Sequence, residues 1–459
     1  MSKHVRVFLG IALVLLTLIP ISLTAGWMKH YGREDITEFG YGVLETWDNG
    51  FVISAHAEDE GVWVIRTDSV GNVQWDSCYD AGLPYMSSNC IRNTRDESYI
   101  LTGSGFRLLK IDLWGFSLMS SSIGYPYTSR WVEQASSRCY IATGRRDTIH
   151  EVEGYASQVW VFKADTLGNV IWENLYGVDG YEIYNEGKCI LETSDSNYMV
   201  CGFTQRDLWL AKLDTFGVVM WENTYLVGEA LSMIEDSDGS IVMAGNEHDS
   251  GGVLVKTSSD GVLLWKKNFR QDATFTSVTG ASDGGYVIAG YTTDEFEMHD
   301  VLVAKTDNMG QELWTKIYGD SANTEWAEHV EHTADGGYIV SGSIRWTAPE
   351  PDNYDVLLLK LDANGDTVTT YISETAPQNE SCFEIITSVG RQILIRYLSN
   401  PASSTPGIVI YDALGRQVDE LFLDGSGTTT WGEGFTPGVY FIREFSGEFL
   451  AVQKVILIR

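Results

Sequence analysis

Two histidines and two glutamates lie close together in the sequence, as Glu328, His329, Glu331 and His332. Imidazole and carboxylate groups are common zinc ligands, so their spacing decides whether they could hold a metal ion. On an extended strand, residues three apart point to opposite faces. The two histidines therefore cannot bind one metal ion together, and we expect neither a metal site nor a catalytic residue in this stretch.

Two acidic turns, "DSDG" (236–239) and "DANGD" (362–366), contain carboxylates at short spacing. Neither places its glycine and a later glutamate at the spacing of an EF-hand calcium loop, and Asp, Asn and Gly are expected at hairpin turns in any case. The one Gly-x-Ser-x-Gly, at 280–284, falls at a predicted hairpin turn and is not a nucleophile elbow, and the chain contains no His-Glu-x-x-His or phosphate-binding glycine loop. We therefore expect no cofactor, although an enzyme site assembled from scattered loops is not excluded.

The composition narrows the range of partners. The 459 residues include 63 Asp and Glu against 31 Lys and Arg, a formal charge of −32. A surface this acidic repels phosphate backbones, so we expect no nucleic-acid partner. Six cysteines in a chain of this length are too few for a disulfide scaffold.

Three short phrases recur in one order seven times, at spacings of 44 to 55 residues. The first resembles "DGGYIVSG" (335–342). The second resembles "VLLLKLD" (356–362), with a basic residue two positions before a final Asp or Ser. The third is Gly-x-x-x-Trp, in which copies two and seven have Met119 and Thr369 instead of tryptophan. The basic residues are Arg66, Lys110, Lys163, Lys212, Lys256, Lys305 and Lys360.

Each repeat is predicted to form four short strands joined by tight turns. Four-stranded units of 40 to 50 residues are typical of β-propeller blades, and seven units predict a ring of seven blades over residues 27–372. The stray fourth-strand phrase "WMKHYG" (27–32) is expected to pair with the sheet of the last unit. The repeated tryptophans should pack between blades, and the repeated basic residue should contact turn carbonyls or the Asp that follows it.

Residues 1–25 have the pattern of a secretory signal peptide, with Lys3 and Arg6 before an apolar run and small residues near Ala25. The run is short for a membrane span, so after cleavage we do not expect an integral membrane protein. An uncleaved anchor is the alternative.

Cys189 and Cys201 lie equally far on either side of Asp195 in a predicted hairpin. They should face each other on paired strands, either as a disulfide or as a reduced buried pair.

The repeats end near Tyr371, and a polar linker (373–380) leads to a different segment, 381–459. Alternating strands and Gly/Pro turns predict a small C-terminal β-sandwich, so the whole chain is expected to be all-β. The segments "IVIYDALGRQV" (408–418), "PGVYFIRE" (437–444) and "KVILIR" (454–459), with Trp431, resemble the C-terminal sorting domain of the bacterial type IX secretion system. That resemblance implies the type IX machinery as a partner and a secreted or outer cell-surface protein, reached through the periplasm. An accessory sandwich of another kind remains the alternative.

The long loops of the predicted propeller indicate where a ligand could bind. The loops between second and third strands and the links between blades share one face, whereas the tight turns share the other. Irregular loops on a rigid scaffold commonly carry binding residues, and exposed aromatic rings suit sugars or protein hot spots. The candidate ligand-binding residues are Tyr125, Tyr127, Trp131, Tyr155, Tyr181, Tyr184, Trp326 and Trp346.

The sequence thus favours a non-enzymatic binding module for a glycan or an extracellular protein. The alternative is a propeller hydrolase or lyase that acts on extracellular polysaccharide, which would need a convergent acid/base pair.

Deleting residues 375–459 tests the sorting-domain resemblance. If the tail directs export, the truncated protein should fold and remain in the periplasm of its native host, as cell fractionation would show. Secretion of the truncated protein at the level of the full chain would remove the type IX interpretation.

Overall fold

A computed structural model describes residues 26–33, 36–79, 87–122, 127–149, 155–178, 180, 183–319, 322–347 and 353–367 of the repeat region. In the C-terminal region it describes residues 383–385, 389–390, 392–397, 407–412, 417–422, 427–444 and 452–457. The predicted signal peptide and the predicted linker lie outside these residues. No helix in the described part of the chain is long and apolar enough to cross a membrane.

The first three repeat units each form four consecutive antiparallel strands. Unit 1 contains β2 (Glu38–Glu45), β3 (Phe51–Ala57), β4 (Gly61–Thr67) and β5 (Val73–Tyr79). Unit 2 contains β6 (Ser87–Asn93), β7 (Ser98–Ser104), β8 (Phe106–Asp112) and β9 (Ser117–Ser122). Unit 3 contains β10 (Tyr127–Gln134), β11 (Tyr140–Ile149), β12 (Tyr155–Ala164) and β13 (Val170–Tyr176).

Units 4 and 5 share one long strand, β17 (Val219–Glu235), because almost no link separates the fourth strand of one from the first strand of the next. Unit 4 begins with β14 (Asn185–Glu192), β15 (Tyr198–Thr204) and β16 (Asp207–Leu213). Unit 5 continues with β18 (Ile241–Glu247), β19 (Gly251–Thr257) and β20 (Leu263–Asn268).

The sixth unit contains β21 (Ala273–Gly280), β22 (Tyr286–Thr293), β23 (His299–Thr306) and β24 (Glu312–Tyr318). The last unit contains β25 (Thr324–His332), β26 (Tyr338–Trp346) and β27 (Asn353–Leu361). Its fourth strand is the N-terminal β1 (Trp27–Tyr31), which pairs with β27 in the register Trp27 to Lys360. The predicted pairing of residues 27–32 with the last unit is confirmed.

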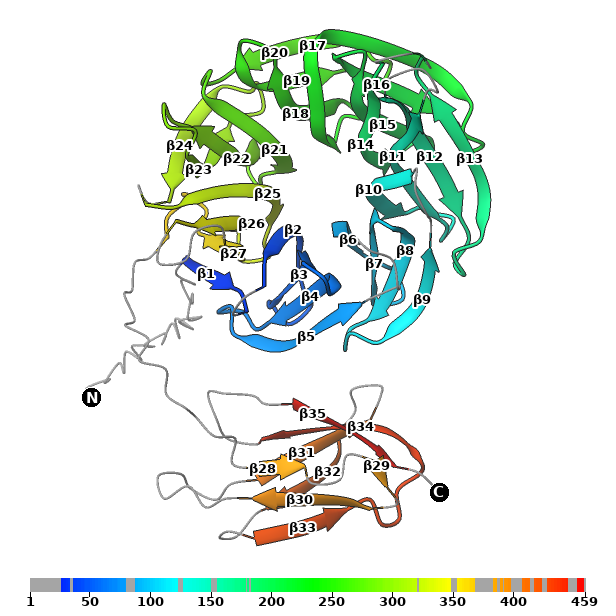
Figure 1. Cartoon of the computed structure of the whole chain (residues 1–459), viewed down its shortest axis with the longest axis vertical. Helices are drawn as coiled ribbons and strands as arrows, with labels where there is room; N and C mark the ends of the chain where they lie inside the picture. The colour runs from blue at the N-terminus through cyan, green and yellow to red at the C-terminus, as the bar shows by residue number, and fades with distance from the viewer. Residues whose placement is uncertain are drawn as a thin grey trace, which may run out of the picture.

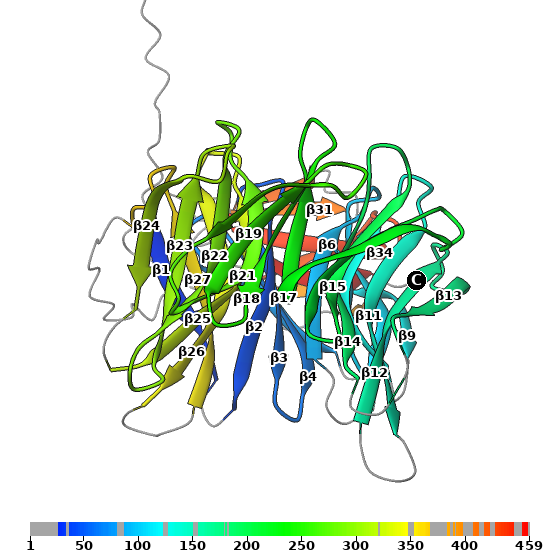
Figure 2. The ribbon, with the colours of Figure 1, turned by 90° about the horizontal axis from the view of Figure 1, so that it is seen from above.

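The sheets are arranged in a ring, with the first strand of each unit innermost (Figure 1). This part of the chain is therefore a β-propeller. We call the side that carries the second-to-third loops and the links the loop face, and the opposite side the turn face. Figure 2 shows the ring from its edge, where the β3–β4 loop emerges on the lower side.

The repeated tryptophans join neighbouring units through one contact, which we call the tryptophan–glycine contact. The fourth-strand ring lies against the glycine of the D-x-x-G turn in the next unit, so closely that a Cβ at Gly217 would lie 2.8 Å from Trp172 Cζ3. These glycines also have positive φ, +80° at Gly217, which other residues rarely adopt. The pairs are Trp27/Gly71, Trp75/Gly115, Met119/Gly168, Trp172/Gly217, Trp221/Gly261, Trp265/Gly310 and Trp314/Gly365.

A tyrosine four residues after the tryptophan strengthens this contact. The Tyr176 hydroxyl donates to the Gly217 carbonyl at 2.6 Å, and Tyr31 donates to the Gly71 carbonyl at 2.7 Å. The pairs Tyr79/Gly115, Tyr225/Gly261 and Tyr318/Gly365 repeat the hydrogen bond. The prediction that the tryptophans pack between units is confirmed, and the N-terminal strand makes the same contact as the others.

The repeated basic residue lies inside its own unit. Lys212 Nζ lies 2.6 Å from Asp195 Oδ2, and Asp195 belongs to the turn between the first and second strands. The predicted partner, the Asp two residues later, was wrong because that carboxylate accepts backbone N–H groups of its own turn, as Asp214 does from Phe216 and Val218. The turn-carbonyl contact is present for Lys360, which donates to the Leu361 carbonyl at 3.1 Å.

Two further sheets form the C-terminal region. One contains β28 (Phe383–Ile385), β30 (Ile393–Tyr397) and β33 (Gly427–Trp431). The other contains β29 (Val389–Gly390), β35 (Val452–Leu457), β34 (Gly438–Glu444), β31 (Gly407–Asp412) and β32 (Gln417–Phe422). Buried residues of both sheets share one core, which includes Ile395, Trp431, Ile410 and Ile442.

Replacing Trp172 by alanine tests the tryptophan–glycine contact. The change removes a half-buried ring and its hydrogen bond to the Thr215 carbonyl, so we expect a loss of about 2 kcal/mol in the free energy of unfolding, measured with urea. Trp47→Ala is the matched control, because Trp47 is 79 % exposed and should change stability little. Equal effects of the two changes would contradict the proposed role of the contact.

Candidate functional site

One irregularity recurs in the innermost strand of every unit. The register between the first and second strands shifts by an extra residue at the same place in β2, β6, β10, β14, β17, β21 and β25. A β-bulge re-aims the side chain of its extra residue, and these strands have a free edge at the centre of the ring. The side chains at the bulges are therefore directed toward the ring axis.

The bulge residues differ in chemistry from unit to unit, unlike the tryptophans and glycines between the units. In chain order they are Tyr41, Asn89, Arg130, Lys188, Leu231, Thr276 and Glu328. A repeated backbone thus presents a set of unlike side chains at one level of the ring. This level is where one ligand could meet groups from several units.

On the turn-face side of the bulge residues, a cluster around Arg92 narrows the centre of the ring. The Arg92 guanidinium lies 3.9 Å from the centre of the Trp131 ring, and its Nη2 lies 3.2 Å from His329 Nε2. Arg92 Nη1 donates to Glu331 at 3.3 Å. Arg92 thus connects units 2, 3 and 7 across the centre, and only about 40 Å³ remains open among the residues around it.

The electrostatics of this cluster follow from burial. Burial and the neighbouring Arg92 hold the pKa of His329 well below its usual value, so the imidazole is neutral. Its Nδ1 accepts from the Val43 backbone N–H at 3.4 Å. Burial raises the pKa of Glu133 to about 7, and attraction to Arg92 only partly offsets this. Burial also raises the pKa of Glu331.

A second charged cluster centres on Glu186, toward the loop face. Arg130 Nε, Lys188 Nζ and Arg145 Nη1 lie 2.5, 2.9 and 3.6 Å from its carboxylate oxygens. Burial alone would raise the pKa of Glu186, but the three cations lower it to about 2. Glu186 is therefore ionised at neutral pH and fixes the side chains of Arg130 and Lys188 in the wall of the ring.

The loop face contains a cavity of about 650 Å³, which we call the loop-face cavity. Four of the bulge residues line it: Lys188, Leu231, Thr276 and Glu328. It is lined from units 4 to 7 by charged, amide and hydroxyl groups, with Tyr291 as its aromatic residue. The polar lining residues are Lys188, Glu229, Asn246, Glu247, His248, Asp249, Gln271, Asp272, Thr274, Thr276, Thr293 and Glu328.

Glu328 is the carboxyl group with the most unusual environment in this cavity. Burial raises its pKa to about 7, opposed by the Trp326 indole N–H that donates to it at 3.1 Å and by Arg130. At neutral pH this side chain exists partly as the neutral acid, which can donate a hydrogen bond as well as accept one.

Of the eight aromatic residues predicted to bind a ligand, the six that the structure describes are not brought together. Trp131 packs under Arg92 in β10, and Trp326 lies in β25 against Phe39 and Tyr354. Trp346, at the end of β26, packs edge-on against His30 and donates to Asp355. These tryptophans were expected in loops and links, but the strands extend further toward the loop face than predicted.

The remaining predicted residues lie apart from the cavity or outside the description. Tyr127 packs on Trp160, and Tyr184 is exposed in the link before β14. Tyr155 begins β12, where it pairs with Ile149. Tyr125 and Tyr181 lie outside the described residues.

Cys189 and Cys201 are directly opposite each other on β14 and β15, as predicted. Both are buried free thiols, so of the two predicted outcomes the structure has the reduced pair. Burial raises the pKa of Cys189 well above its usual value, and directly opposed strand positions are unfavourable for disulfide geometry.

The two histidines near the ring centre have separate surroundings. His329 contacts Arg92 and Trp131, whereas His332 packs edge-on against Tyr338. In the described part of the chain, no three His, Cys, Asp or Glu side chains are grouped closely enough to hold a metal ion.

Sequence reasoning missed Lys188, Glu229, Tyr291 and Glu328 as lining residues. One signal was available, because the seven first strands align by their distance from the turn that follows. At the aligned position of the bulge residues, the residue types no longer follow the apolar pattern and differ from unit to unit. The sequence does not indicate that these side chains face the ring axis, because the extra residue that changes their direction is visible only in the strand register.

Comparison with known proteins finds no matching family model and no matching curated protein. Among solved structures, the chain is similar to the WD40 β-propeller domain of Doa1, at 11 % identity over 72 % of this chain and 95 % of that one (TM-score 0.47). It is similar to the Dos1 propeller, at 14 % identity over 70 % and 77 % (TM-score 0.46). It is also similar to a protein of unknown function from Bacteroides caccae, at 12 % identity over 61 % and 93 % (TM-score 0.41).

Glu133 makes stability depend on pH near neutrality. The folded protein holds the Glu133 proton up to about pH 7, whereas an unfolded chain releases it near pH 4.5. This stabilising contribution is therefore present below pH 4.5 and lost as the pH rises through 7. The groups that act on Glu133 are Arg92, Glu331 and Glu192.

The free energy of unfolding, measured with urea, should fall between pH 5 and pH 8 in the wild type. In Glu133→Gln this fall should be smaller by about 1 to 2 kcal/mol, since a pKa difference of one corresponds to about 1.4 kcal/mol. Trp47→Ala, which removes no titratable group, is the control and should leave the pH dependence unchanged. An identical pH dependence in wild type and Glu133→Gln would show that Glu133 is ionised in the folded protein.

Proposed function

We propose that this chain is an extracellular, non-enzymatic binding module whose loop-face cavity binds a glycan. The observation that carries the proposal is the cavity of about 650 Å³, in which carboxylate, amide and hydroxyl groups from four units surround one tyrosine. Sugar hydroxyls both donate and accept hydrogen bonds, so carboxylates and amides are suitable partners, and an aromatic ring packs on the apolar face of a sugar. A cavity of this size suits one or two sugar residues.

The proposal includes the arrangement of the whole chain. Seven blades close the ring, which is supported by seven tryptophan–glycine or methionine–glycine pairs that lead from each unit to the next and back to the first. The two C-terminal sheets form a β-sandwich that acts as a type IX sorting domain, which is supported by their shared core and by the sequence resemblance. Together with the signal-peptide pattern, this arrangement implies a protein that acts outside the cell.

A binding screen with the full chain tests the function. The protein should bind a subset of extracellular polysaccharides on a glycan array, and the same sugars should bind in solution by calorimetry. Glu229→Ala and Tyr291→Phe remove lining groups, and each should weaken binding about tenfold, because an unpaired hydrogen-bonding group costs about 1.4 kcal/mol or more.

The control is Ser282→Ala, an exposed residue of the turn face, which should bind as the wild type does. Equal affinity of the folded cavity variants and the wild type would show that the glycan binds outside the loop-face cavity. Binding of an extracellular protein without any glycan binding would favour a protein ligand instead.

One observation favours the alternative of a polysaccharide hydrolase or lyase. Glu328 faces the cavity with a pKa raised to about 7 by burial, the property of a general acid. Incubation of the bound polysaccharide with wild type and Glu328→Gln would separate the two functions. Release of reducing or unsaturated ends by the wild type alone would assign the protein to the enzyme class.

A further inference from the structure

A hydrogen-bonded pair of a tryptophan and an acidic residue occurs at the same place in three units. The tryptophan belongs to the third strand, and its Nε1–H donates to a carboxylate on the neighbouring fourth strand. The pairs are Trp63 with Asp76 at 2.9 Å, Trp160 with Glu173 at 3.1 Å, and Trp209 with Glu222 at 2.9 Å.

In units 1 and 3 an arginine of the protein lies at this tryptophan, and the unit 1 arginine, Arg33, forms its ion pairs with Glu38 and Glu60. The Arg33 guanidinium lies 4.5 Å from the centre of the Trp63 ring. The Arg107 guanidinium lies 5.8 Å from the centre of the Trp160 ring and 3.8 Å from the Glu173 carboxylate. A planar guanidinium suits such a position because it can stack on a ring and donate to a carboxylate together.

The third pair has no such arginine. Arg33 ends the sequence Tyr-Gly-Arg (31–33), which follows the tyrosine that contacts the next unit, and the same place after β13 reads Tyr-Gly-Val (176–178). Val178 is 53 % exposed and lines an open pocket of about 460 Å³. Within the described residues no cation forms an ion pair with Glu222.

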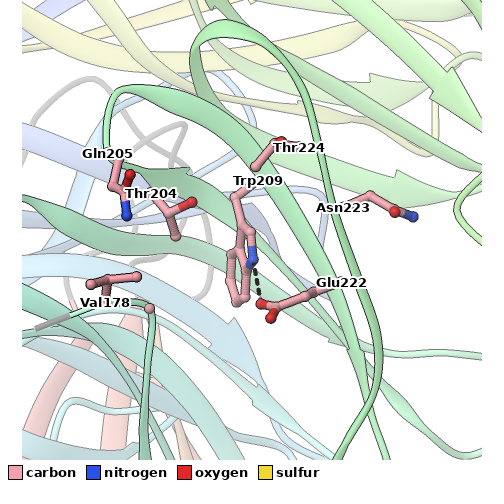
Figure 3. A pocket seen from close by; sticks show the side chains of 8 residues that line it. Val178, Thr204, Gln205, Trp209, Glu222, Asn223 and Thr224 are labelled. Atoms are coloured by element: carbon pink, nitrogen blue, oxygen red, sulfur yellow. Dashed lines mark hydrogen bonds between the residues drawn. The ribbon is translucent and has the colours of Figure 1, made fainter.

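We call this pocket the Glu222 pocket (Figure 3). Trp209, Glu222 and Gln205 face its interior, with Thr204, Thr224 and Val178 around them. Trp209 is only 2 % exposed, so its main effect is to hold the Glu222 carboxylate in place. The carboxylate, the Gln205 amide oxygen and the threonine hydroxyls can all accept hydrogen bonds from a guanidinium.

We propose that the Glu222 pocket binds the guanidinium group of an arginine side chain from a partner protein. The protein itself supplies one full example of that arrangement, Arg107 at Trp160 and Glu173, and a partial one, Arg33 over Trp63. The formal charge of −32 attracts a basic partner at long range. The pocket lies on the outer part of unit 4, so it is a second site, separate from the loop-face cavity.

The probe is the capped tripeptide acetyl-Gly-Arg-Gly-amide, compared with the same peptide carrying citrulline, which is uncharged and nearly the same shape. The full chain, labelled with ¹⁵N at its tryptophans, reports binding through the indole N–H signals. The arginine peptide should shift the Trp209 signal in a saturable way, and the citrulline peptide should not. Equal shifts with both peptides, or no shift of Trp209, would overturn the proposal.

Two variants and a control test the residues. Glu222→Gln should weaken binding of the arginine peptide about fivefold, the upper end for a single exposed charge pair. Val178→Arg should abolish it by filling the pocket as Arg33 does at Trp63. Glu173→Gln is the matched control, because Arg107 already lies at that pair.

Thermal melting confirms that each variant is folded. If folded Glu222→Gln and Val178→Arg bind the arginine peptide with wild-type affinity, the peptide does not bind in the Glu222 pocket. Glu229→Ala, in the loop-face cavity, should leave peptide binding unchanged, so failure of the glycan proposal and failure of this one give different results.

Discussion

The contact between a fourth-strand aromatic ring and a turn glycine holds the ring of sheets together. The glycine is required twice, for its positive φ and for the close approach of the ring, which leaves no room for a Cβ at Gly217 or Gly365. Because each sheet has little core of its own, it is stable only when its neighbours cover both faces. The contact thus links each unit's stability to the next, and the hydroxyl of Tyr176 or Tyr318 fixes the distance.

The same repetition leaves the centre of the ring free to vary. Bulges in the innermost strands give every unit one side chain near the axis whose identity the packing between units does not dictate. Arg130, Lys188 and Glu328 are charged, and Leu231 is apolar, yet the backbone around them is nearly constant. Structural demands are met at the outer strands, and the inner strands are available for recognition.

The repeat phrases predicted the strands, their order and the pairing of β1 with β27, because tight turns and alternating apolar residues are local signals. The residues that line the loop-face cavity were not predicted, for a physical reason. Exposed aromatics were sought in loops, but Trp131 and Trp326 lie in strands, where they pack against Arg92 and Phe39. The polar lining of the loop-face cavity comes from residues of ordinary type, such as Glu229 and Thr276, that converge only through the curvature of the ring.

The pairing of β1 with β27 also has a consequence for how the chain folds. These strands come from the two ends of the repeat region, so the last sheet cannot be completed until the whole region is available. Contacts between residues so distant in sequence are slow to form, because a long loop must close first. Until then, Trp27 and the apolar edge of β27 have no partner. A partly made chain is therefore an open, incomplete ring that exposes apolar surface, and completion of the final sheet is the step that ends its tendency to aggregate.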